Sequence, residues 1–321
     1  MTKPPATKGQ STHTQDPLTT GLDFLTAAVA DLADYREGTK LKFGLVNLFT
    51  GIEILLKVRL AREHWSLVFR DVSKATKSDM RTGNFRSVQF DSAIDRLRAI
   101  CGIQFSRKHT QALHAVSKDR NTLMHIGYMS HPSRVRPIAA KALDFMISFI
   151  ADELEPHGIS KEASDCVERI RNGLSGINDY VTERTRTIDP LLKASRTAVV
   201  QCSMCFEYTT IIDNGAAKCQ LCDFVSSGEH AADLYVRTIL DISTTDELEK
   251  GEMWPVHSCK ECDEFSFVKM PERVTGIDTH WACFACGVEA KDKDVMPCAG
   301  CHEPMIITLG HGAFCSDCPP I

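Results

Sequence analysis

The sequence predicts a mainly α-helical front part followed by small β-hairpin modules. Apolar residues recur every three or four positions through the first half of the chain, which is the spacing of a helix with one buried face. Six Cys-x-x-Cys pairs follow between residues 202 and 318, a pattern typical of short hairpins that hold a metal ion. With 321 residues the chain is long enough for two or more domains.

The front part begins with a tail, residues 1–18, that is rich in Thr, Pro, Lys and Gln and has almost no apolar content. We expect this tail to be disordered, because it cannot bury enough surface to offset the entropy of ordering. Residues 19–155 then read as one helical bundle, and residues 156–200 as a helical connector. The helices of the bundle are expected at residues 22–35, 42–64, 94–100, 107–123 and 138–150.

The cysteine pairs divide the back part into modules. Thirteen residues separate the first two pairs and also the last two, whereas twenty separate the middle two. These gaps predict a first zinc ribbon at residues 201–228, a helical linker at 229–252, a second ribbon at 253–290 and a third at 291–321. The expected ligands are Cys202, Cys205, Cys219 and Cys222, then Cys259, Cys262, Cys283 and Cys286, then Cys298, Cys301, Cys315 and Cys318.

Three structural Zn²⁺ ions are therefore the expected cofactors. A tetrahedral four-cysteine site leaves no position for water, so such sites stabilise a fold and do not hydrolyse substrates. The last four pairs could instead interleave in a cross-braced arrangement, and the pairs could also be redox dithiols, although those occur singly. His257, His280, His302 and His311 lie near the pairs as substitute ligands, but each set is complete without them.

Composition restricts the surroundings and partners of the chain. The longest apolar run has ten residues, and no charged start leads into an apolar stretch, so we expect no signal peptide and no membrane span. Cysteine pairs of this kind predict a reducing, cytoplasmic location. Residues 1–155 hold 22 Lys and Arg against 16 Asp and Glu, and residues 156–321 hold 15 against 26, so a polyanion would meet the front part.

One segment of the front part has the residues of a catalytic site. Arg120 is followed directly by Asn121 and, after three more residues, by His125 at the end of a predicted helix. Three other Arg and His pairs have similar spacing, starting at Arg59, Arg107 and Arg273, so spacing alone does not select this one. The context does, because among these four pairs only Arg120 directly precedes Asn and only His125 has a glycine, Gly127, two residues later.

The Arg-Asn-x-x-x-His segment resembles the R-x4-6-H signature of the HEPN superfamily. The stretch from Gly51 to Lys57, with Glu53 and Lys57 flanking aliphatic residues, is similar to the second helix of many HEPN domains. The resemblance covers about residues 20–155. HEPN domains fused to zinc ribbons resemble arrangements found in prokaryotic defence and toxin systems.

The resemblance implies a metal-independent endoribonuclease that acts as a homodimer on RNA. His125 would transfer protons, Arg120 would bind the phosphate, and Asn121 would orient the phosphate or His125, giving a 2′,3′-cyclic phosphate and a 5′-hydroxyl. Residues five apart on an unbroken helix point about 140° from one another, so either the helix breaks near Gly127 or two copies combine their faces. Glu53, Lys57, Lys118 and Tyr128 are expected to serve packing or solubility.

Other functions remain open from the sequence. Arg120 and His125 could be surface residues in ordinary salt bridges, for instance with Asp119. The chain could then be a non-catalytic dimerising adaptor whose ribbons bind a protein trigger, target or inhibitor. A DNA-binding role for the ribbons is disfavoured by the acidity of the back part.

Overall fold

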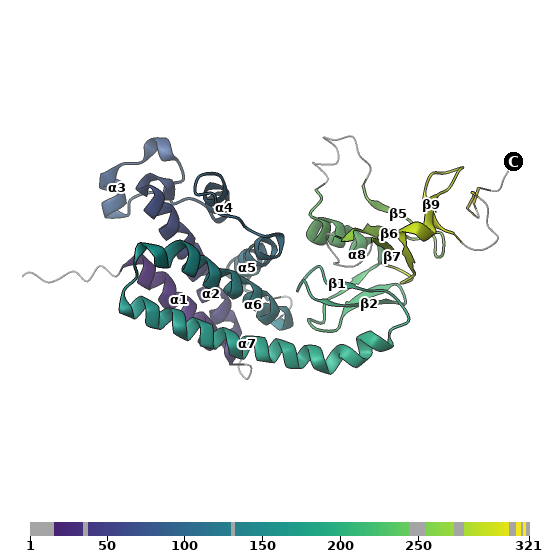
Figure 1. Ribbon diagram of the computed structural model, residues 1–321, viewed down its shortest axis with the longest axis horizontal. Coiled ribbons are helices and arrows are strands. Elements are labelled where there is room, and N and C mark those ends of the chain that lie inside the picture. The colour runs from purple at the N-terminus through teal and green to yellow at the C-terminus, as the bar shows by residue number, and fades with distance from the viewer. Residues whose placement is uncertain are drawn as a thin grey trace, which may run out of the picture. The chain divides into compact units, whose positions relative to one another are not determined.

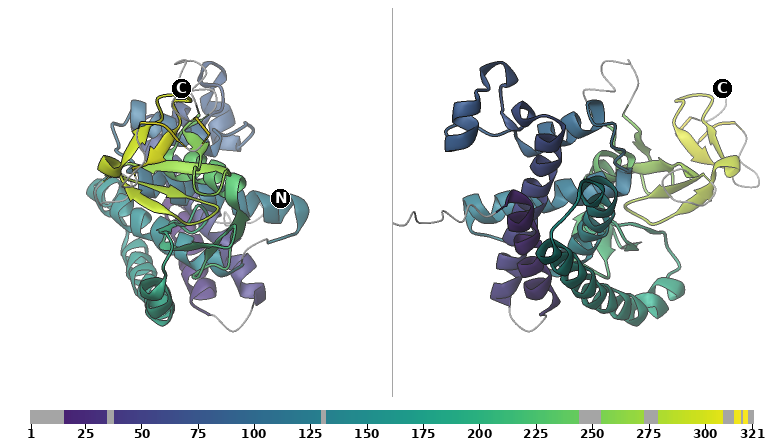
Figure 2. Two further views of the ribbon diagram at one scale, coloured as in Figure 1. Left: turned by 90° about the vertical axis from the view of Figure 1, so that its right-hand side faces the viewer. Right: turned by 60° about the vertical axis from the view of Figure 1, so that its left-hand side comes forward.

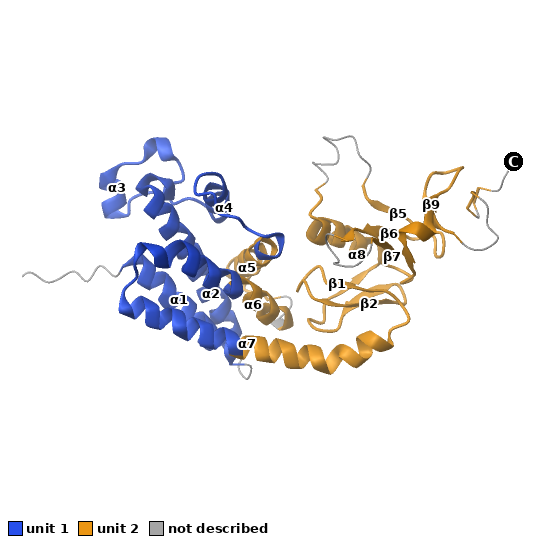
Figure 3. Cartoon of the chain, viewed as in Figure 1, with its two compact units in different colours: residues 1–109, 143–175 blue, residues 110–142, 176–321 orange. Residues whose placement is uncertain are grey.

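The computed structural model describes residues 16–34, 38–129, 132–243, 254–272, 279–307, 313–315 and 317–318. The chain divides into two compact units, coloured separately in Figure 3: residues 1–109 with 143–175, and residues 110–142 with 176–321. Three helices contribute residues to both units: α5 (Arg107–Ile126), α6 (Pro132–Phe149) and α7 (Lys161–Ala194). The chain is therefore mainly helical in its front part and has small sheets in its back part, as predicted.

The first unit is built on two long helices that lie side by side, α1 (Pro17–Ala33) and α2 (Gly38–Glu63) (Figure 1). Their backbones approach closely where Gly21 faces Gly51. A Cβ on Gly51 would lie 2.9 Å from the carbonyl oxygen of Gly21 and 2.7 Å from a methyl of Leu25, so the contact requires glycine. Leu18 is buried in α1, so the helix begins inside the predicted tail, of which residues 1–15 lie outside the described residues.

The remaining elements of the first unit are short. They are the 3₁₀ turns at Trp65–Val68 and Val72–Lys74, α3 (Lys77–Thr82), α4 (Phe90–Ala99), a π turn at Ile150–Leu154 and a 3₁₀ turn at Glu155–His157. Arg96 organises the segment before α3, because its guanidinium donates to the backbone carbonyls of Leu67 and Phe69. No helix among the described residues is long and apolar enough to cross a membrane.

Two similar four-stranded sheets form the centre of the second unit (Figures 1 and 2). Both are antiparallel, with each strand paired to the next in sequence, and both have a bulge between their first two strands. The first sheet contains β1 (Val199–Gln201), β2 (Tyr208–Asp213), β3 (Ala216–Cys219) and β4 (Val225–Ser227), and the second contains β5 (Val256–Ser258), β6 (Phe265–Met270), β7 (His280–Cys283) and β8 (Glu289–Lys291).

The hairpin tips account for the different cysteine gaps of these two modules. Strands β2 and β6 have the same length, and so do β3 and β7. The connection between β2 and β3 is two residues, Asn214 and Gly215, both with positive φ, as a tight type I′ turn requires. The connection between β6 and β7 is nine residues, 271–279. The difference of seven equals the difference between gaps of twenty and thirteen.

The two sheets share one apolar core with α8 (Gly228–Tyr235) and the π turn Val236–Leu240 that continues it. Tyr235, Val236 and Ile239 are buried there because they recur on one face of the helix. Residues 229–252 were expected as a linker; those up to 240 are part of this core, and 244–252 lie outside the described residues.

Gly287 lies where the two sheet modules approach closely. Its φ is +76°, and a Cβ there would lie 2.5 Å from the carbonyl oxygen of Ile212 and 2.7 Å from Cβ of Thr197. The carbonyl of Gly287 accepts a hydrogen bond of 2.9 Å from the amide of Ala198. A side chain at this position would separate the sheets.

The third module has one hairpin in its described part, β9 (Val295–Pro297) paired with β10 (Pro304–Ile306). Val295 and Ile306 pack against the apolar cluster that includes Phe267 and Trp281 of the second sheet. The first and third modules share a cysteine gap, yet the first and second share the four-stranded sheet.

Candidate metal centres and the arginine and histidine helix

Five Cys-x-x-Cys turns have the same backbone hydrogen bonds. The amide of the first cysteine donates to the carbonyl five residues later, as Cys202 does to Glu207 at 2.8 Å. The amide that follows the second cysteine donates back to the first cysteine, as Phe206 does to Cys202 at 3.0 Å. Both bonds recur in the turns that begin at Cys219, Cys259, Cys283 and Cys298.

The residue after the second cysteine is left-handed in each of these five turns. Its φ is between 59° and 76°, and the residues are Phe206, Asp223, Asp263, Gly287 and His302. A left-handed conformation costs a non-glycine residue about 1–2 kcal/mol. Four turns accept this cost, and the resulting shape holds the two sulfurs of a turn near one point.

The turns bring the twelve cysteines together as three sets of four, and within each set all sulfurs lie within 4.8 Å of one another. The sets follow the order of the sequence, so the structure has the sequential pairing and not the cross-braced alternative. They are Cys202, Cys205, Cys219 and Cys222; Cys259, Cys262, Cys283 and Cys286; and Cys298, Cys301, Cys315 and Cys318.

The spacing of the sulfurs fits a tetrahedral metal ion. Four sulfurs at about 2.3 Å from a central zinc would lie about 3.8 Å from one another. The Sγ atoms of Cys202 and Cys222 are 3.8 Å apart, and those of Cys205 and Cys219 are 3.7 Å apart. The second set repeats these two distances across its turns, and in the third set Cys301 and Cys315 are 3.7 Å apart. A disulfide would require about 2.05 Å.

Hydroxyl groups lie next to one sulfur in each of the first two sets. Thr209 Oγ1 is 3.1 Å from Sγ of Cys219, and Ser266 Oγ is 3.2 Å from Sγ of Cys283. Both hydroxyls come four residues after the second cysteine of the preceding turn, on β2 and β6. A hydrogen bond to a ligating thiolate fixes its orientation and stabilises its negative charge.

Hydrogen bonding also favours the thiolate form of particular cysteines. Hydrogen bonds from Cys259 and then Ser266, opposed by burial, lower the pKa of Cys283 to about 4. In the third set, hydrogen bonds from the backbone amides of Cys301 and Cys315 lower the pKa of Cys298 to about 6. Burial raises the pKa of Cys286 to about 12. A divalent ion that binds four sulfurs would complete the deprotonation.

The three sets differ in burial. All four cysteines of the first set are buried, and Ile188 of α7 packs on them with Leu221. The second set has two buried and two partly exposed cysteines, whereas Cys301 of the third set is exposed. We therefore expect the third set to exchange its metal most readily.

Of the histidines near the sets, His257 contacts a carboxylate, His302 belongs to a cysteine turn, and His311 lies outside the described residues. His257 Nδ1 is 3.3 Å from a carboxylate oxygen of Glu303, and His302 is the left-handed residue of its turn. Four thiolates without histidine are a donor set that suits zinc or iron, and each set could hold one such ion without an open position.

The structure places Arg120, Asn121 and His125 on one helix, α5. The helix continues without a break to Ile126, and Gly127 follows with φ +71°. The Cα positions of Arg120 and His125 therefore do point about 140° from one another. Arg120 nevertheless reaches round the helix, because its Nη1 donates to Oδ1 of Asn121 at 3.0 Å.

Asn121 and His125 share a helix face with two more polar residues. His114, Lys118, Asn121 and His125 are all exposed and are spaced by four, three and four positions, and we call them the polar face of α5. The contact between Arg120 and Asn121 brings the guanidinium to this face. A permanent charge, an amide and an imidazole therefore lie along one side of the helix.

The acidic residue of α5 is already paired. Asp119 binds Arg134 of α6 through both carboxylate oxygens, with 2.9 Å between Nε of Arg134 and Oδ2 of Asp119. The side chains are 15% and 4% exposed, respectively. Both carboxylate oxygens of Asp119, the residue that the sequence offers as a salt-bridge partner of Arg120 or His125, accept hydrogen bonds from Arg134.

Glu53 and Lys57, in the stretch that resembles the second helix of HEPN domains, make structural contacts. Lys57 donates to Glu53 at 2.8 Å and to Ser87 Oγ at 2.9 Å, within the first unit. At the end of α5, in contrast, large apolar side chains are exposed: Met124 is 57%, Ile126 74% and Tyr128 61% accessible.

Several residues that serve these sites were not found from the sequence. Arg134 and Lys141, both buried, read as ordinary surface charges in a helical pattern. Thr209 and Ser266 could have been predicted, because each is a hydroxyl residue four positions after the second cysteine of a Cys-x-x-Cys pair. Comparison of the chain with protein-family models, curated proteins and solved structures finds no match.

Proposed function

We propose that this protein is a metal-independent endoribonuclease of the HEPN type, with Arg120, Asn121 and His125 at its active site. The contact between the Arg120 guanidinium and Asn121, on the helix face that also bears the exposed His125, is the observation that carries this proposal. Cleavage would leave a 2′,3′-cyclic phosphate and a 5′-hydroxyl.

The charge of α5 suits a polyanion. Residues 107–126 include four Lys and Arg and one acid, Asp119, together with three histidines. Because Arg134 binds Asp119, this carboxylate does not offset the cations of the polar face. Phosphate groups of RNA are the polyanion for which Arg and Lys provide most of the affinity.

The residues match the chemistry of RNA cleavage. The 2′-hydroxyl is the nucleophile, so the reaction needs a base for its proton, an acid for the leaving 5′-oxygen and positive charge at the phosphate. His125 can transfer protons near neutral pH, because the ordinary pKa of imidazole is near 6.5. The guanidinium of Arg120 would donate to two phosphate oxygens, and its hydrogen bond to Asn121 would keep it on the polar face.

A dimer would complete the site. The Arg120 and His125 motif supplies one imidazole per chain, which leaves the second proton transfer to another group, and His125 of a second copy would supply it. The exposed Met124, Ile126 and Tyr128 beside His125 favour an interface at this end of α5.

The cysteine modules would contain three structural zinc ions and would recognise a partner. Each four-thiolate zinc site adds about two negative charges to a region that is already acidic, so a basic protein trigger, target or inhibitor fits it better than a nucleic acid. This arrangement suits a toxin or an antiviral defence effector that is held inactive until the modules bind their signal.

RNA cleavage by the purified protein tests the proposal. Wild type, His125→Ala and Arg120→Ala are incubated briefly with a labelled single-stranded RNA and EDTA, and the end groups of the products are identified. His157→Ala, which removes an exposed histidine of the first unit, is the matched control. We expect both α5 variants to lose at least about 100-fold in rate and the control to retain it. Full activity in His125→Ala would exclude the site, and a strict Mg²⁺ requirement would exclude the mechanism.

A non-catalytic dimerising adaptor is the second candidate. The exposed apolar side chains at the end of α5 favour it, because they serve an interface whether or not RNA is cut. An adaptor would dimerise through Met124, Ile126 and Tyr128 and show no cleavage of any RNA. Loss of dimerisation in Ile126→Asp, measured by sedimentation, combined with an inactive wild type, would select it.

A further inference from the structure

We propose that the first four-cysteine centre positions α5, and that Arg134 is the positioning residue through which it does so. The catalytic consequence of this inference rests on the proposed ribonuclease function. The structural consequence, a dependence of α5 on the first metal ion, does not. All residues involved belong to the second unit.

Arg134 links α5 to the first cysteine turn. Two of its nitrogens bind the carboxylate of Asp119, and its third, Nη1, donates to Sδ of Met204 at 3.3 Å. Met204 lies between Cys202 and Cys205, and its own amide donates to Sγ of Cys202 at 3.3 Å. Asp119 directly precedes Arg120. One buried side chain therefore contacts both the metal turn and the residue next to the proposed phosphate-binding arginine.

A buried ion pair of this kind is better suited to fixing geometry than to adding stability. The desolvation of Arg134 and Asp119 roughly offsets their attraction, but removal of one partner leaves the other charge buried and unpaired. The pair also fixes direction, because an arginine that donates two hydrogen bonds to one carboxylate holds it in the plane of the guanidinium. Asp119 is thereby held in one orientation, and so is the helix turn that carries Arg120 and Asn121.

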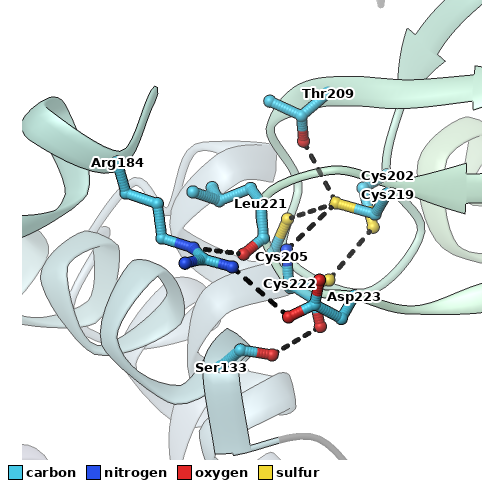
Figure 4. A network of polar contacts seen from close by, with 9 residues as sticks. All are labelled: Ser133, Arg184, Cys202, Cys205, Thr209, Cys219, Leu221, Cys222 and Asp223. Carbon is cyan, nitrogen blue, oxygen red and sulfur yellow. Dashed lines mark hydrogen bonds and ion pairs between the residues drawn. The ribbon is translucent and has the colours of Figure 1, made fainter. Parts of the chain in front are cut away.

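Further donors from outside the sheet hold the same metal turns (Figure 4). Ser133 of α6 donates to the carbonyl of Cys222, and Arg184 of α7 donates to the carbonyl of Leu221 at 3.0 Å and to Asp223 at 3.3 Å. Lys141 of α6 donates to the carbonyl of Cys205 at 3.2 Å and binds Glu207. These acceptors belong to the two cysteine turns or to the residues beside them.

Such acceptors are in place only while the turns keep their shape. Metal binding is what folds a four-cysteine turn pair, so loss of the ion would displace the carbonyls of Cys205, Leu221 and Cys222 and the side chain of Met204. Arg134 would lose its contact with Met204, and Ser133 its contact with Cys222, at the same time. The first centre is also the most buried of the three, so its metal ion would be lost only on deliberate removal or cysteine oxidation.

The position of the contacts along α5 separates this inference from general destabilisation. Gln111, near the start of α5, donates to the carbonyl of Thr238 in the π turn Val236–Leu240, a contact that does not involve the first centre. Asp119 lies two turns further on. Loss of the Arg134 contacts or of the first metal ion should therefore increase the mobility of residues 116–126 and leave the helix turn around Gln111 unchanged.

Hydrogen exchange of the full-length, metal-loaded chain tests the inference. Arg134→Met should leave three metal ions per chain and accelerate amide exchange in residues 116–126 by roughly tenfold or more, with little change near Gln111. Arg134→Lys, which keeps a charge for Asp119, should restore part of the protection. Arg186→Met removes an exposed arginine of the same unit and is the matched control.

A ligand variant provides the second measurement. Cys219→Ser should release one metal ion and reproduce the exchange pattern of Arg134→Met, whereas Cys315→Ser in the third set should release one ion without changing α5. Unchanged exchange of residues 116–126 in both Arg134→Met and Cys219→Ser would overturn the inference, as would equal acceleration in Cys315→Ser.

The activity measurement distinguishes failure of the two proposals. If wild type cleaves RNA, Arg134→Met should lower kcat more than it changes KM, and Arg134→Lys should recover part of kcat. If wild type does not cleave RNA, the proposed function fails while the exchange results still decide whether the first centre positions α5.

Discussion

Replacement of Gly287 by alanine should loosen the junction between the two four-stranded sheets. The left-handed φ of +76° costs alanine about 1–2 kcal/mol. The new Cβ would also lie 2.5 Å from the Ile212 carbonyl oxygen and 2.7 Å from Cβ of Thr197, and forced overpacking of this kind costs about 1–3 kcal/mol. Together these give a loss of about 2–5 kcal/mol in the free energy of unfolding of the second unit.

Gly215→Ala is the matched control, because φ there is +79° but no atom lies within 4 Å of the added Cβ. It should lose only the backbone part, about 1–2 kcal/mol. Urea unfolding at a fixed metal concentration measures both variants, followed by tryptophan fluorescence in a Trp65→Phe background, which leaves Trp254 and Trp281 of the second unit. Metal content is checked before each experiment. Equal destabilisation in the two variants would show that the close approach at Gly287 carries no energetic weight and that the reasoning about the junction is wrong.

Three further perturbations test other parts of the structure. Cys301→Ser should reduce bound zinc from three ions to two with little change in thermal stability, since its set is the most exposed; loss of all three ions, measured by emission spectrometry, would contradict independent sites. Thr209→Val should weaken the first centre about 10–100-fold in competition with a chromophoric chelator, while Thr209→Ser should not, because the hydroxyl hydrogen bond to Cys219 is retained. Burial lowers the pKa of His109, whose ring packs 5.2 Å from that of Phe145. The unfolded chain therefore binds a proton first as pH falls below about 6.5, and the first unit should lose stability there. His109→Phe should flatten that decline in urea midpoints read from Trp65; an unchanged slope would assign the pH dependence to other groups.

The sequence predicted what depends on local spacing. A Cys-x-x-Cys turn determines its own hydrogen bonds, so the sequential grouping of the twelve cysteines into three sets of four followed from the pattern alone. The long helices followed for the same reason, because one buried face imposes a spacing of three and four, but α1, α2, α4 and α6 begin four to six residues before their predicted starts and α3 was not predicted. A break near Gly127 was one of two alternatives for the motif; α5 instead runs unbroken through Arg120 and His125 to Ile126, where the left-handed Gly127 ends it.

Contacts between distant segments could not be predicted in this way. Nothing in the order of residues shows that Tyr235 packs into a core shared by two sheets, or that Arg134 turns inward to Asp119 and Met204. The direction of the Arg120 side chain was also inaccessible, because a helical pattern gives the angle of Cα and not the course of a long side chain. The ribonuclease assignment itself stays a prediction.

The hairpin tips have an evolutionary consequence. Two modules of one chain keep the same strands, the same turn hydrogen bonds and equivalent hydroxyl groups at Thr209 and Ser266, while their tips differ by seven residues. The arrangement of the four cysteines is thus the same at both tip lengths, and insertions there should be nearly neutral. Duplicated or related modules should diverge first in the gap between their cysteine pairs, so common ancestry is better judged from the serine or threonine four residues after a pair than from a fixed gap.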